Sequence, residues 1–161
     1  MSTTKRSAFT LVEILIVVVI MAVLAAVVIP QFTGSTEDAK ASTAEFNVGG
    51  LRSVIQTYRA HHAGGVPALD TTNKAIPGLI NKTTASGTVS TSGEFGPYLV
   101  EMPSNPYTSS SDVKAVATAG AKPVAGDVTV DSNGDFTGGW IYDASTGQIW
   151  LDSNVDGEFA W

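Results

Sequence analysis

The side chains best placed to do chemistry carry oxygen atoms and lie near the C-terminal end of the sequence. Asp152, Asn154 and Asp156 occupy alternate positions, and Gly157 follows them. This spacing matches the first half of a calcium-binding loop, in which alternate oxygen ligands turn inward and a glycine permits the bend. The second half has no counterpart, so Glu158 or backbone carbonyl groups would have to complete the shell. Asx turns, a common use of Asp and Asn in loops, explain the same residues without a metal ion.

A second acidic segment, residues 131–135, repeats this spacing less completely. Asp131, Asn133 and Asp135 alternate, but Phe136 stands where the bend requires a glycine. An Asx-type turn is the alternative interpretation for this segment too, and the calcium prediction here is weaker than for residues 152–158.

The other unusual side chain is Glu13, a carboxylate inside an otherwise apolar segment. Residues 14–29 carry no charge, and Pro30 closes the run. A carboxylate costs about 2.5–3.5 kcal/mol at the centre of a membrane, so a compensating group is expected. An α-amino group created by cleavage before Phe9 would pair with Glu13 of a neighbouring subunit. Alternatively, Glu13 would reach the lipid headgroups, because it lies near one end of the segment.

The apolar segment is long enough to cross a membrane. As a helix, residues 9–29 would span roughly 31 Å, about the thickness of the hydrocarbon core of a bilayer. Lys5 and Arg6 precede the segment, and the first charge after it belongs to Glu37. The positive-inside rule therefore predicts a cytoplasmic N-terminus and export of the rest of the chain.

A small residue, Ala8, lies before the apolar segment rather than after it. An ordinary secretory signal has a shorter apolar region with its cleavage site behind it. Cleavage between Ala8 and Phe9 would instead remove a basic leader, residues 1–8, and keep residues 9–30 as a hydrophobic helix.

Residues 31–62 are expected to continue as an amphipathic helix. One face carries apolar side chains at three- and four-residue spacing, while charged residues such as Arg52 should be solvated. The apolar positions are Ala44, Val48, Leu51, Ile55 and Tyr58. Pro30 removes a backbone hydrogen bond, so we expect a bend or a local opening there. His61 and His62 are expected to lie in solvent near the helix end.

Residues 63–161 are predicted to form a globular region of loops and a small antiparallel sheet. Residues 63–93, rich in Gly, Ser, Thr and Asn, should form a long connection with a short helix near residues 76–81. Strands are predicted at residues 113–118, 127–130, 139–143 and 148–152, and the last two should pair as a hairpin. The expected fold is α+β, with a long N-terminal helix packed against the sheet.

Composition narrows the function. The chain has 161 residues, no cysteine and a net charge of −6. No disulfide can staple the exported region, and the acidic balance argues against nucleic acid as the main partner. The sequence has no nucleophile elbow, no His-Glu-x-x-His motif and no phosphate-binding loop. These observations predict a structural protein rather than an enzyme.

Residues 8–13, together with the apolar run that ends at Pro30, resemble the prepilin N-terminal methylation motif of type IV pilins and type II secretion pseudopilins. The resemblance implies that a prepilin peptidase cleaves between Ala8 and Phe9, and that the new amino group of Phe9 is methylated. It also implies that Glu13 sets the registry of neighbouring subunits and that the helix loosens at Pro30 on assembly. The chain departs from the family at Ala8, where glycine is usual, but the small size is kept.

Residues 96–106 resemble a segment of the major pseudopilin of type II secretion. Asn105 stands where that family usually has Asp, and no Trp follows Pro106. The major pseudopilin carries calcium in its C-terminal loop, in a similar place. The resemblance therefore strengthens the calcium prediction for Asp152, Asn154, Asp156 and Glu158.

We therefore expect a structural subunit of a pilus-like helical filament that most resembles the major pseudopilin of a type II secretion system. A type IV pilin forming surface fibres for adhesion, motility or DNA uptake is the first alternative, and an anchored binding module that never polymerises is the second. The resemblance implies a single-pass inner-membrane protein with a periplasmic C-terminal region before assembly, and a filament in the periplasm or at the cell surface. Its partners would be further copies of the chain, the prepilin peptidase, the assembly platform and minor pilins or pseudopilins.

Overall fold

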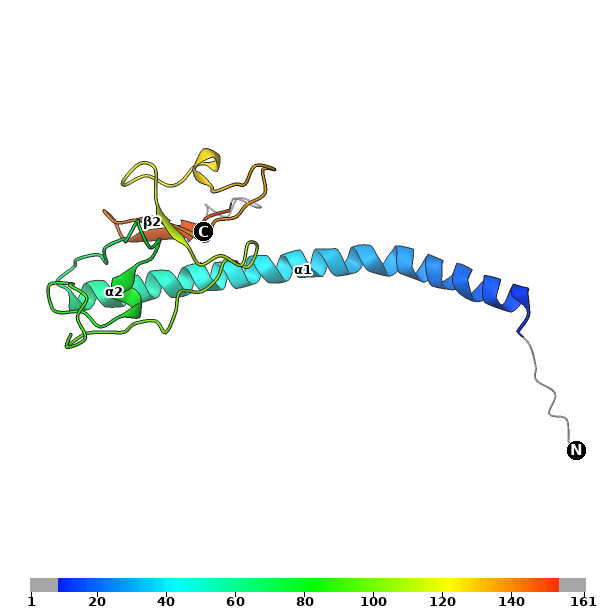
Figure 1. Cartoon of the computed structure of the whole chain (residues 1–161), viewed down its shortest axis with the longest axis horizontal. Coiled ribbons are helices and arrows are strands. Elements are labelled where there is room, and N and C mark those ends of the chain that lie inside the picture. The colour runs from blue at the N-terminus through cyan, green and yellow to red at the C-terminus, as the bar shows by residue number, and fades with distance from the viewer. Residues whose placement is uncertain (1–8, 154–161) are drawn as a thin grey trace, which may run out of the picture. The chain divides into compact units, whose positions relative to one another are not determined.

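The computed structural model describes residues 9–153 of the chain. A long helix comes first, and short helices and strands follow it (Figure 1). In chain order the elements are α1 (Leu11–His61), α2 (Pro77–Ile80), β1 (Val113–Ala115), the 3₁₀ helix η1 (Ala125–Asp127), β2 (Trp140–Asp143) and β3 (Gln148–Leu151). The chain divides after Ala39 into two compact units.

In the first unit, the apolar side chains of α1 are exposed. Between Leu11 and Ile29 even the least exposed large apolar side chain, Val28, keeps 43% of its surface open. Among the residues that the structure describes, α1 is the one helix long and apolar enough to cross a membrane. A helix that is apolar on all sides is stable only in apolar surroundings.

The backbone of α1 stays helical through Pro30, so the proline does not end the helix. The helix runs on to His61, one residue short of its expected end. A proline inside a helix leaves the carbonyl group four residues upstream without its usual N–H partner. The loosening of the helix at Pro30 on assembly stays a prediction.

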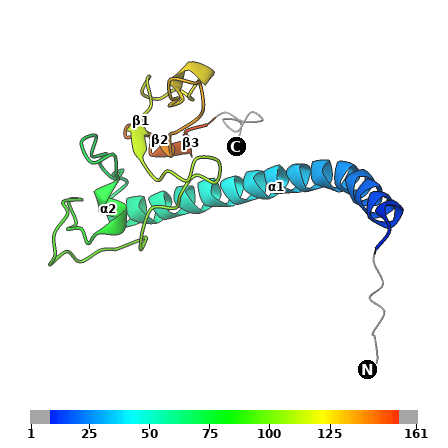
Figure 2. The same ribbon diagram turned by 45° about the vertical axis from the view of Figure 1, so that its right-hand side comes forward.

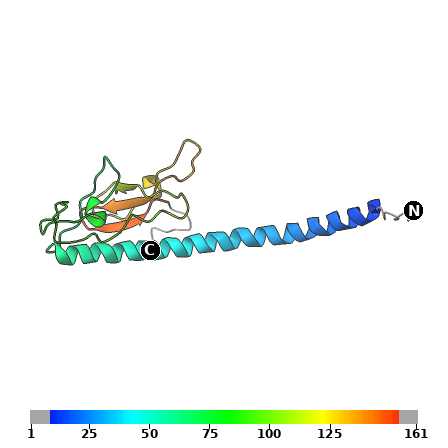
Figure 3. The same ribbon diagram turned by 60° about the horizontal axis from the view of Figure 1, so that its bottom comes forward.

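In the second unit, the C-terminal part of α1 buries the face that its periodicity predicts. The buried positions are Ala44, Val48, Leu51, Ile55 and Tyr58. They share one core with side chains from α2, from the residue before it and from all three strands: Ile76, Leu79, Val113, Trp140, Tyr142, Ile149 and Leu151. Figure 3 shows β2 and β3, in orange and red, lying along this part of α1. Because burial of a Val, Leu or Ile side chain contributes about 1.5–3 kcal/mol, this face fixes the C-terminal part of α1 to the sheet.

The sheet has the order β1-β2-β3 and is mixed, not antiparallel as expected (Figure 2). β2 and β3 pair as the predicted hairpin, with Trp140 opposite Leu151. β1 runs parallel to β2, with Val113 opposite Trp140. The prediction was wrong because apolar alternation carries no information on strand direction. Two parallel strands must begin at the same end of the sheet. The long connection of residues 116–139 brings the chain back to the end at which β1 began, and β2 starts there.

Residues 127–130, predicted as a strand, form no ladder. η1 covers the start of this segment, and Val130 makes a single isolated bridge to Phe136. The Thr129 N–H donates to the Asp152 carboxylate at 2.8 Å instead of to a neighbouring strand. This segment therefore joins the sheet through side chains rather than through backbone pairing.

Two side chains that were expected in solvent take part in the fold. The Arg52 guanidinium donates to the carbonyl of Ile149 from Nε at 3.2 Å and from Nη2 at 3.1 Å. His62 is buried: its Nδ1 donates to the Tyr58 carbonyl at 2.7 Å, and its Nε2 lies 2.9 Å from the Thr83 hydroxyl. The expectation for His62 was wrong because the connection of residues 63–93 folds back over this end of α1.

Candidate functional site

Glu13 lies in the first turn of α1, and its carboxylate closes a capping box with Thr10. Glu13 Oε2 accepts hydrogen bonds from Thr10 N at 2.8 Å and from Thr10 Oγ1 at 2.9 Å. The Glu13 N–H donates in return to Thr10 Oγ1 at 3.3 Å. Reciprocal bonds of this kind satisfy amide groups that lack partners at a helix start. Sequence reasoning missed this role, although the Thr-x-x-Glu spacing is its signature.

The capping bonds leave the charge of Glu13 in place, because Thr10 is neutral. Phe9, the residue at which the mature chain is expected to begin, precedes the capping residue and is 82% exposed. Ala8, on the other side of the expected cleavage point, lies outside the described residues. Phe9 and Glu13 thus lie together at the start of α1, where an amino group and a carboxylate of neighbouring subunits are expected to meet.

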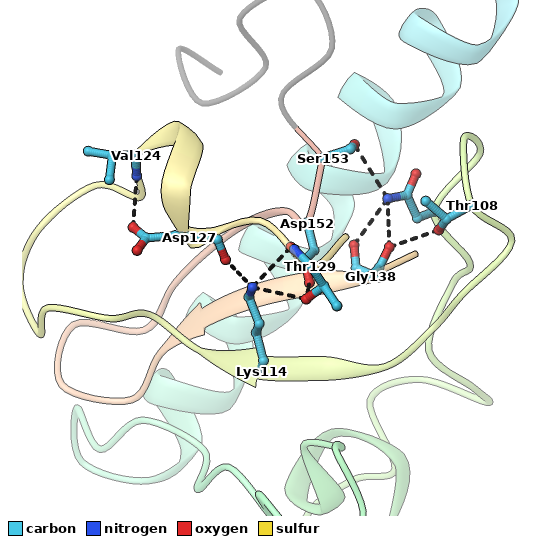
Figure 4. A network of polar contacts seen from close by, with 10 residues as sticks. Thr108, Lys114, Val124, Asp127, Thr129, Gly138, Asp152 and Ser153 are labelled. Atoms are coloured by element: carbon cyan, nitrogen blue, oxygen red, sulfur yellow. Dashed lines mark hydrogen bonds and ion pairs between the residues drawn. The ribbon is translucent and has the colours of Figure 1, made fainter. Parts of the chain in front are cut away.

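Asp152, the first residue of the predicted calcium loop, is buried directly after β3. Its side chain is 2% exposed, and Lys114 Nζ lies 3.3 Å from its Oδ1. Thr129 donates to both oxygens, from N to Oδ1 at 2.8 Å and from Oγ1 to Oδ2 at 2.5 Å. Figure 4 shows these groups converging on Asp152. At this residue the arrangement fits a compensated ion pair, because a calcium ion next to Oδ1 would face the ammonium group of Lys114.

The other three predicted calcium ligands, Asn154, Asp156 and Glu158, lie outside the described residues. No cluster of three or more His, Cys, Asp or Glu side chains that suits a metal ion occurs within residues 9–153. Calcium at the C-terminal loop stays a prediction.

The interpretation of residues 131–135 as an Asx-type turn is confirmed. Asp131 Oδ1 accepts hydrogen bonds from Asn133 N at 2.8 Å and from Asp135 N at 3.0 Å. These bonds hold the pKa of the exposed Asp131 carboxyl below its usual range. The carboxylate thus closes its own loop.

Residues 96–106 tie the helices to the sheet. The amides of Tyr98 and Leu99 both donate to the Leu79 carbonyl of α2 at 2.9 Å. The Trp140 indole of β2 donates to the Pro103 carbonyl at 2.8 Å. This segment positions the strand end on which the buried charges lie.

Asn105, in the same segment, is fully buried beside that strand end. Its Nδ2 donates to the carbonyls of Gly138 and Gly139 at 3.1 and 3.4 Å, and lies 3.5 Å from Ser153 Oγ. Its Oδ1 accepts from Tyr107 N at 2.9 Å. A carboxylate at this position would direct an oxygen at two carbonyl oxygens. The amide of Asn105 therefore matches surroundings that would disfavour the aspartate usual in the resembled family.

The polar network thus joins segments that are distant in the sequence. Sequence reasoning missed Lys114 and Thr129, since neither has a fixed spacing to Asp152 that would mark it. The contacts of Asn105 likewise become visible only once the segment is folded against β2.

Comparison with known proteins agrees with this organisation. Residues 3–29 match the family described as the prokaryotic N-terminal methylation motif. The chain is similar to the type II secretion system core protein G of Pseudomonas aeruginosa, with 28% identity over 116 residues that cover 72% of this chain and 78% of the relative. It is also similar to the fimbrial protein EcpB of Eikenella corrodens, with 28% identity over 72 residues that cover 45% of this chain and 44% of the relative. No solved structure matches the chain.

A third comparison decides the family. The type II secretion system core protein G of Escherichia coli is 30% identical over 108 residues, which cover 66% of this chain and 70% of that protein. The methylation motif, the long apolar helix and the small sheet behind it agree with this match. The chain therefore belongs to the family of type II secretion system core protein G.

Proposed function

We propose that the chain is the major structural subunit of a pilus-like filament of a type II secretion system. The observation that carries this proposal is the first part of α1, whose apolar side chains are exposed on all sides between Leu11 and Ile29. Such a helix is stable in lipid and equally stable in a bundle of identical helices. The membrane would hold the subunits in reserve, and the filament would be their assembled state.

Identical subunits that stack head to tail without closing a ring form an open helical filament. In this arrangement the amino group of Phe9 in one subunit would pair with Glu13 of the next. The second unit of the chain, which carries the sheet, would contribute a folded body attached to each helix. This role is structural and requires no catalysis.

The subunit would reach the filament in three steps. The positive charges of Lys5 and Arg6 would keep the N-terminus in the cytoplasm while the rest of the chain crosses the inner membrane. A prepilin peptidase would cleave between Ala8 and Phe9 and the amino group of Phe9 would be methylated. The assembly platform would then draw the helix from the membrane into the filament, with minor pseudopilins as further partners.

A type IV pilin that forms surface fibres is the second candidate. The similarity to the fimbrial protein EcpB favours it, but that match covers less than half of this chain. The core protein G relatives match over a larger share of the chain, which favours the secretion role. An anchored module that never polymerises would leave the methylation motif without a purpose.

The test uses host cells that lack this chain and are complemented with variants at the cleavage point. Ala8→Gly restores the residue usual in the family and should support processing, whereas the bulky, charged Ala8→Arg should block it. We expect folded enzymes to reach the medium with wild type and Ala8→Gly, and to stay in the periplasm with Ala8→Arg.

Immunogold labelling of intact cells distinguishes the candidates. Long labelled surface fibres together with normal secretion in the deleted strain would establish the pilin alternative. Normal secretion in the deleted strain, with neither labelled fibres nor cross-links between copies of the chain in wild-type cells, would favour the anchored module that never polymerises.

A further inference from the structure

The buried carboxylate of Asp152 requires surrounding groups that compensate its charge. The Asp152 N–H donates to the Gly139 carbonyl at 2.9 Å, which fixes the residue beside β2. Its side chain is 2% exposed and points toward β1 and the segment after η1 (Figure 4). A buried charge is strongly destabilising unless a counter-charge, a metal ion or several hydrogen-bond donors compensate it. The polar groups around Asp152 must therefore supply that compensation.

Lys114, in the middle of β1, extends its ammonium group into this position. Its Nζ lies 3.3 Å from Asp152 Oδ1 and 2.9 Å from Thr129 Oγ1, and it also donates to the Asp127 carbonyl. One carboxylate, one hydroxyl and one carbonyl oxygen thus surround a single positive charge. Calcium ions in proteins take oxygen ligands of these same kinds. An ammonium group has three N–H donors, and the structure provides one oxygen atom for each.

The backbone at Gly138 packs closely against the Asp152 carboxylate. A Cβ atom at Gly138 would collide with the Asp152 carboxylate, so glycine is needed for this approach. The Gly138 carbonyl is occupied by two neutral donors, Thr108 Oγ1 at 2.8 Å and Asn105 Nδ2 at 3.1 Å. The Gly138 carbonyl oxygen, which could otherwise bind a cation, therefore already accepts hydrogen bonds from the protein.

We propose that Lys114 is a built-in cation that takes the place of a metal ion at Asp152. The ammonium group joins three segments, namely β1, the stretch from the end of η1 to Thr129, and the residue that follows β3. The folded domain then holds its C-terminal strand in place without calcium at Asp152. This inference stands on the geometry within the second unit and does not depend on the proposed function.

The test compares the thermal unfolding of the full chain in detergent, with calcium and with a chelator. Wild type should melt at the same temperature under both conditions. Lys114→Met removes the charge and keeps most of the apolar stem. We expect it to melt roughly 5–10 °C lower in chelator, because the Asp152 carboxylate loses its counter-charge. Calcium should restore a large part of this loss in Lys114→Met alone.

A matched control is Lys74→Met, which removes a lysine from a salt bridge to Asp112 on the surface. These side chains are 62% and 55% exposed, so the melting temperature should change by about 2 °C or less and should not respond to calcium. Lys114→Arg keeps the charge and should remain insensitive to calcium, which provides a folded variant should Lys114→Met fail to fold.

Two results would overturn the proposal. The first is a wild-type chain whose melting temperature rises in calcium by several degrees, with the same rise in Lys114→Arg and no rise in Asp152→Asn, since calcium would then bind Asp152 in spite of the lysine. The second is a folded Lys114→Met variant that melts with wild type in chelator, since Asp152 would then not depend on the ammonium group.

Discussion

Two carboxylates in this chain lie in opposite electrostatic settings. Glu13, at the start of α1, is exposed and is held by the neutral Thr10 within its own helical turn. Asp152, after β3, is buried and is held by Lys114, which is 38 positions away in the sequence. One carboxylate thus keeps its charge at the surface of the subunit, and the other has its charge compensated inside the fold.

The difference separates a residue suited to assembly from a residue suited to stability. A carboxylate whose charge is already paired within one subunit is not available to bind a cation of a second subunit. A carboxylate that is capped only by neutral groups is stabilised when a cation of another subunit approaches it. This stabilisation is large in apolar surroundings, where charge pairs are strong. We therefore expect changes at Glu13 to affect the filament and changes at Asp152 to affect the domain.

The largest expected effect is on assembly, in the variant Glu13→Gln. Glutamine can still accept the Thr10 hydrogen bonds, so the cap survives while the charge is lost. If Glu13 pairs with the amino group of Phe9 in a neighbouring subunit, the amount of assembled filament should fall by at least about tenfold. Cross-linking between copies of the chain in cells measures this loss, and the melting temperature of the purified chain should stay at the wild-type value.

Normal cross-linking in Glu13→Gln would contradict the charge-pairing role. It would leave capping of α1, or contact with lipid headgroups, as the function of this side chain.

The second effect is on stability, in the variant Asp152→Ala. Breaking a buried ion pair costs about 3–5 kcal/mol, and a third of the Lys114 side chain is in solvent, so we expect a loss of about 2–4 kcal/mol. Urea unfolding followed by tryptophan fluorescence measures it. The exposed pair supplies the control, because Asp112→Ala should cost no more than about 1 kcal/mol. Equal losses in the two variants would show that burial gives the Asp152 pair no special weight.

A third carboxylate, Asp143 at the end of β2, combines burial with neutral partners. It accepts hydrogen bonds from Ser145 N and Oγ, from Thr146 Oγ1 and from Gly120 N, all between 2.7 and 2.8 Å. Burial by itself would raise the pKa of Asp143, but these hydrogen bonds outweigh it and hold the pKa well below the usual carboxyl range. Asp143 therefore tests whether neutral donors alone can compensate a buried charge.

Because the pKa of Asp143 is lowered on folding, its contribution to stability is present above the unfolded value of about 3.9. This contribution is lost as the pH falls from there through the folded pKa. We expect the urea midpoint of wild type to drop below about pH 4, and Asp143→Asn to be less stable at neutral pH but to show a flatter acid limb. An unchanged acid limb in Asp143→Asn would assign the drop to other carboxylates.

The elements of the fold were largely predictable because they rest on local periodicity. The buried face of α1, from Ala44 to Tyr58, follows from three- and four-residue spacing, and the β2–β3 hairpin follows from two apolar strands around a turn. The direction of β1 was not predictable, because it depends on the route of residues 116–139. The burial of His62 depends in the same way on a connection that carries no periodic pattern.

The site residues divide along the same line. The cap formed by Thr10 and Glu13 is a local pattern, and its spacing could have been read from the sequence. The pair of Lys114 and Asp152 depends on β1 lying beside β2 in the observed register, and the sequence carries no signal for that pairing. The alternation of Asp152 with Asn154 and Asp156 predicted a metal ion because it is a local pattern. The internal cation, Lys114, comes from a distant strand and leaves no such pattern in the sequence.

The smallest expected effect separates the cap at Glu13 from its charge. Thr10→Val keeps the shape of the side chain and removes the hydroxyl group that bonds to Glu13 in both directions. The first turn of α1 should fray, and the amides of Leu11, Val12 and Glu13 should exchange hydrogen about two- to tenfold faster in detergent micelles, as expected for a lost N-cap. Thr10→Ser keeps the hydroxyl group and should exchange at the wild-type rate. Assembly should fall far less in Thr10→Val than in Glu13→Gln, because the carboxylate keeps its charge and its place on the helix. If Thr10→Val instead reduces cross-linking as much as Glu13→Gln does, the geometry of the cap rather than the charge of Glu13 controls assembly.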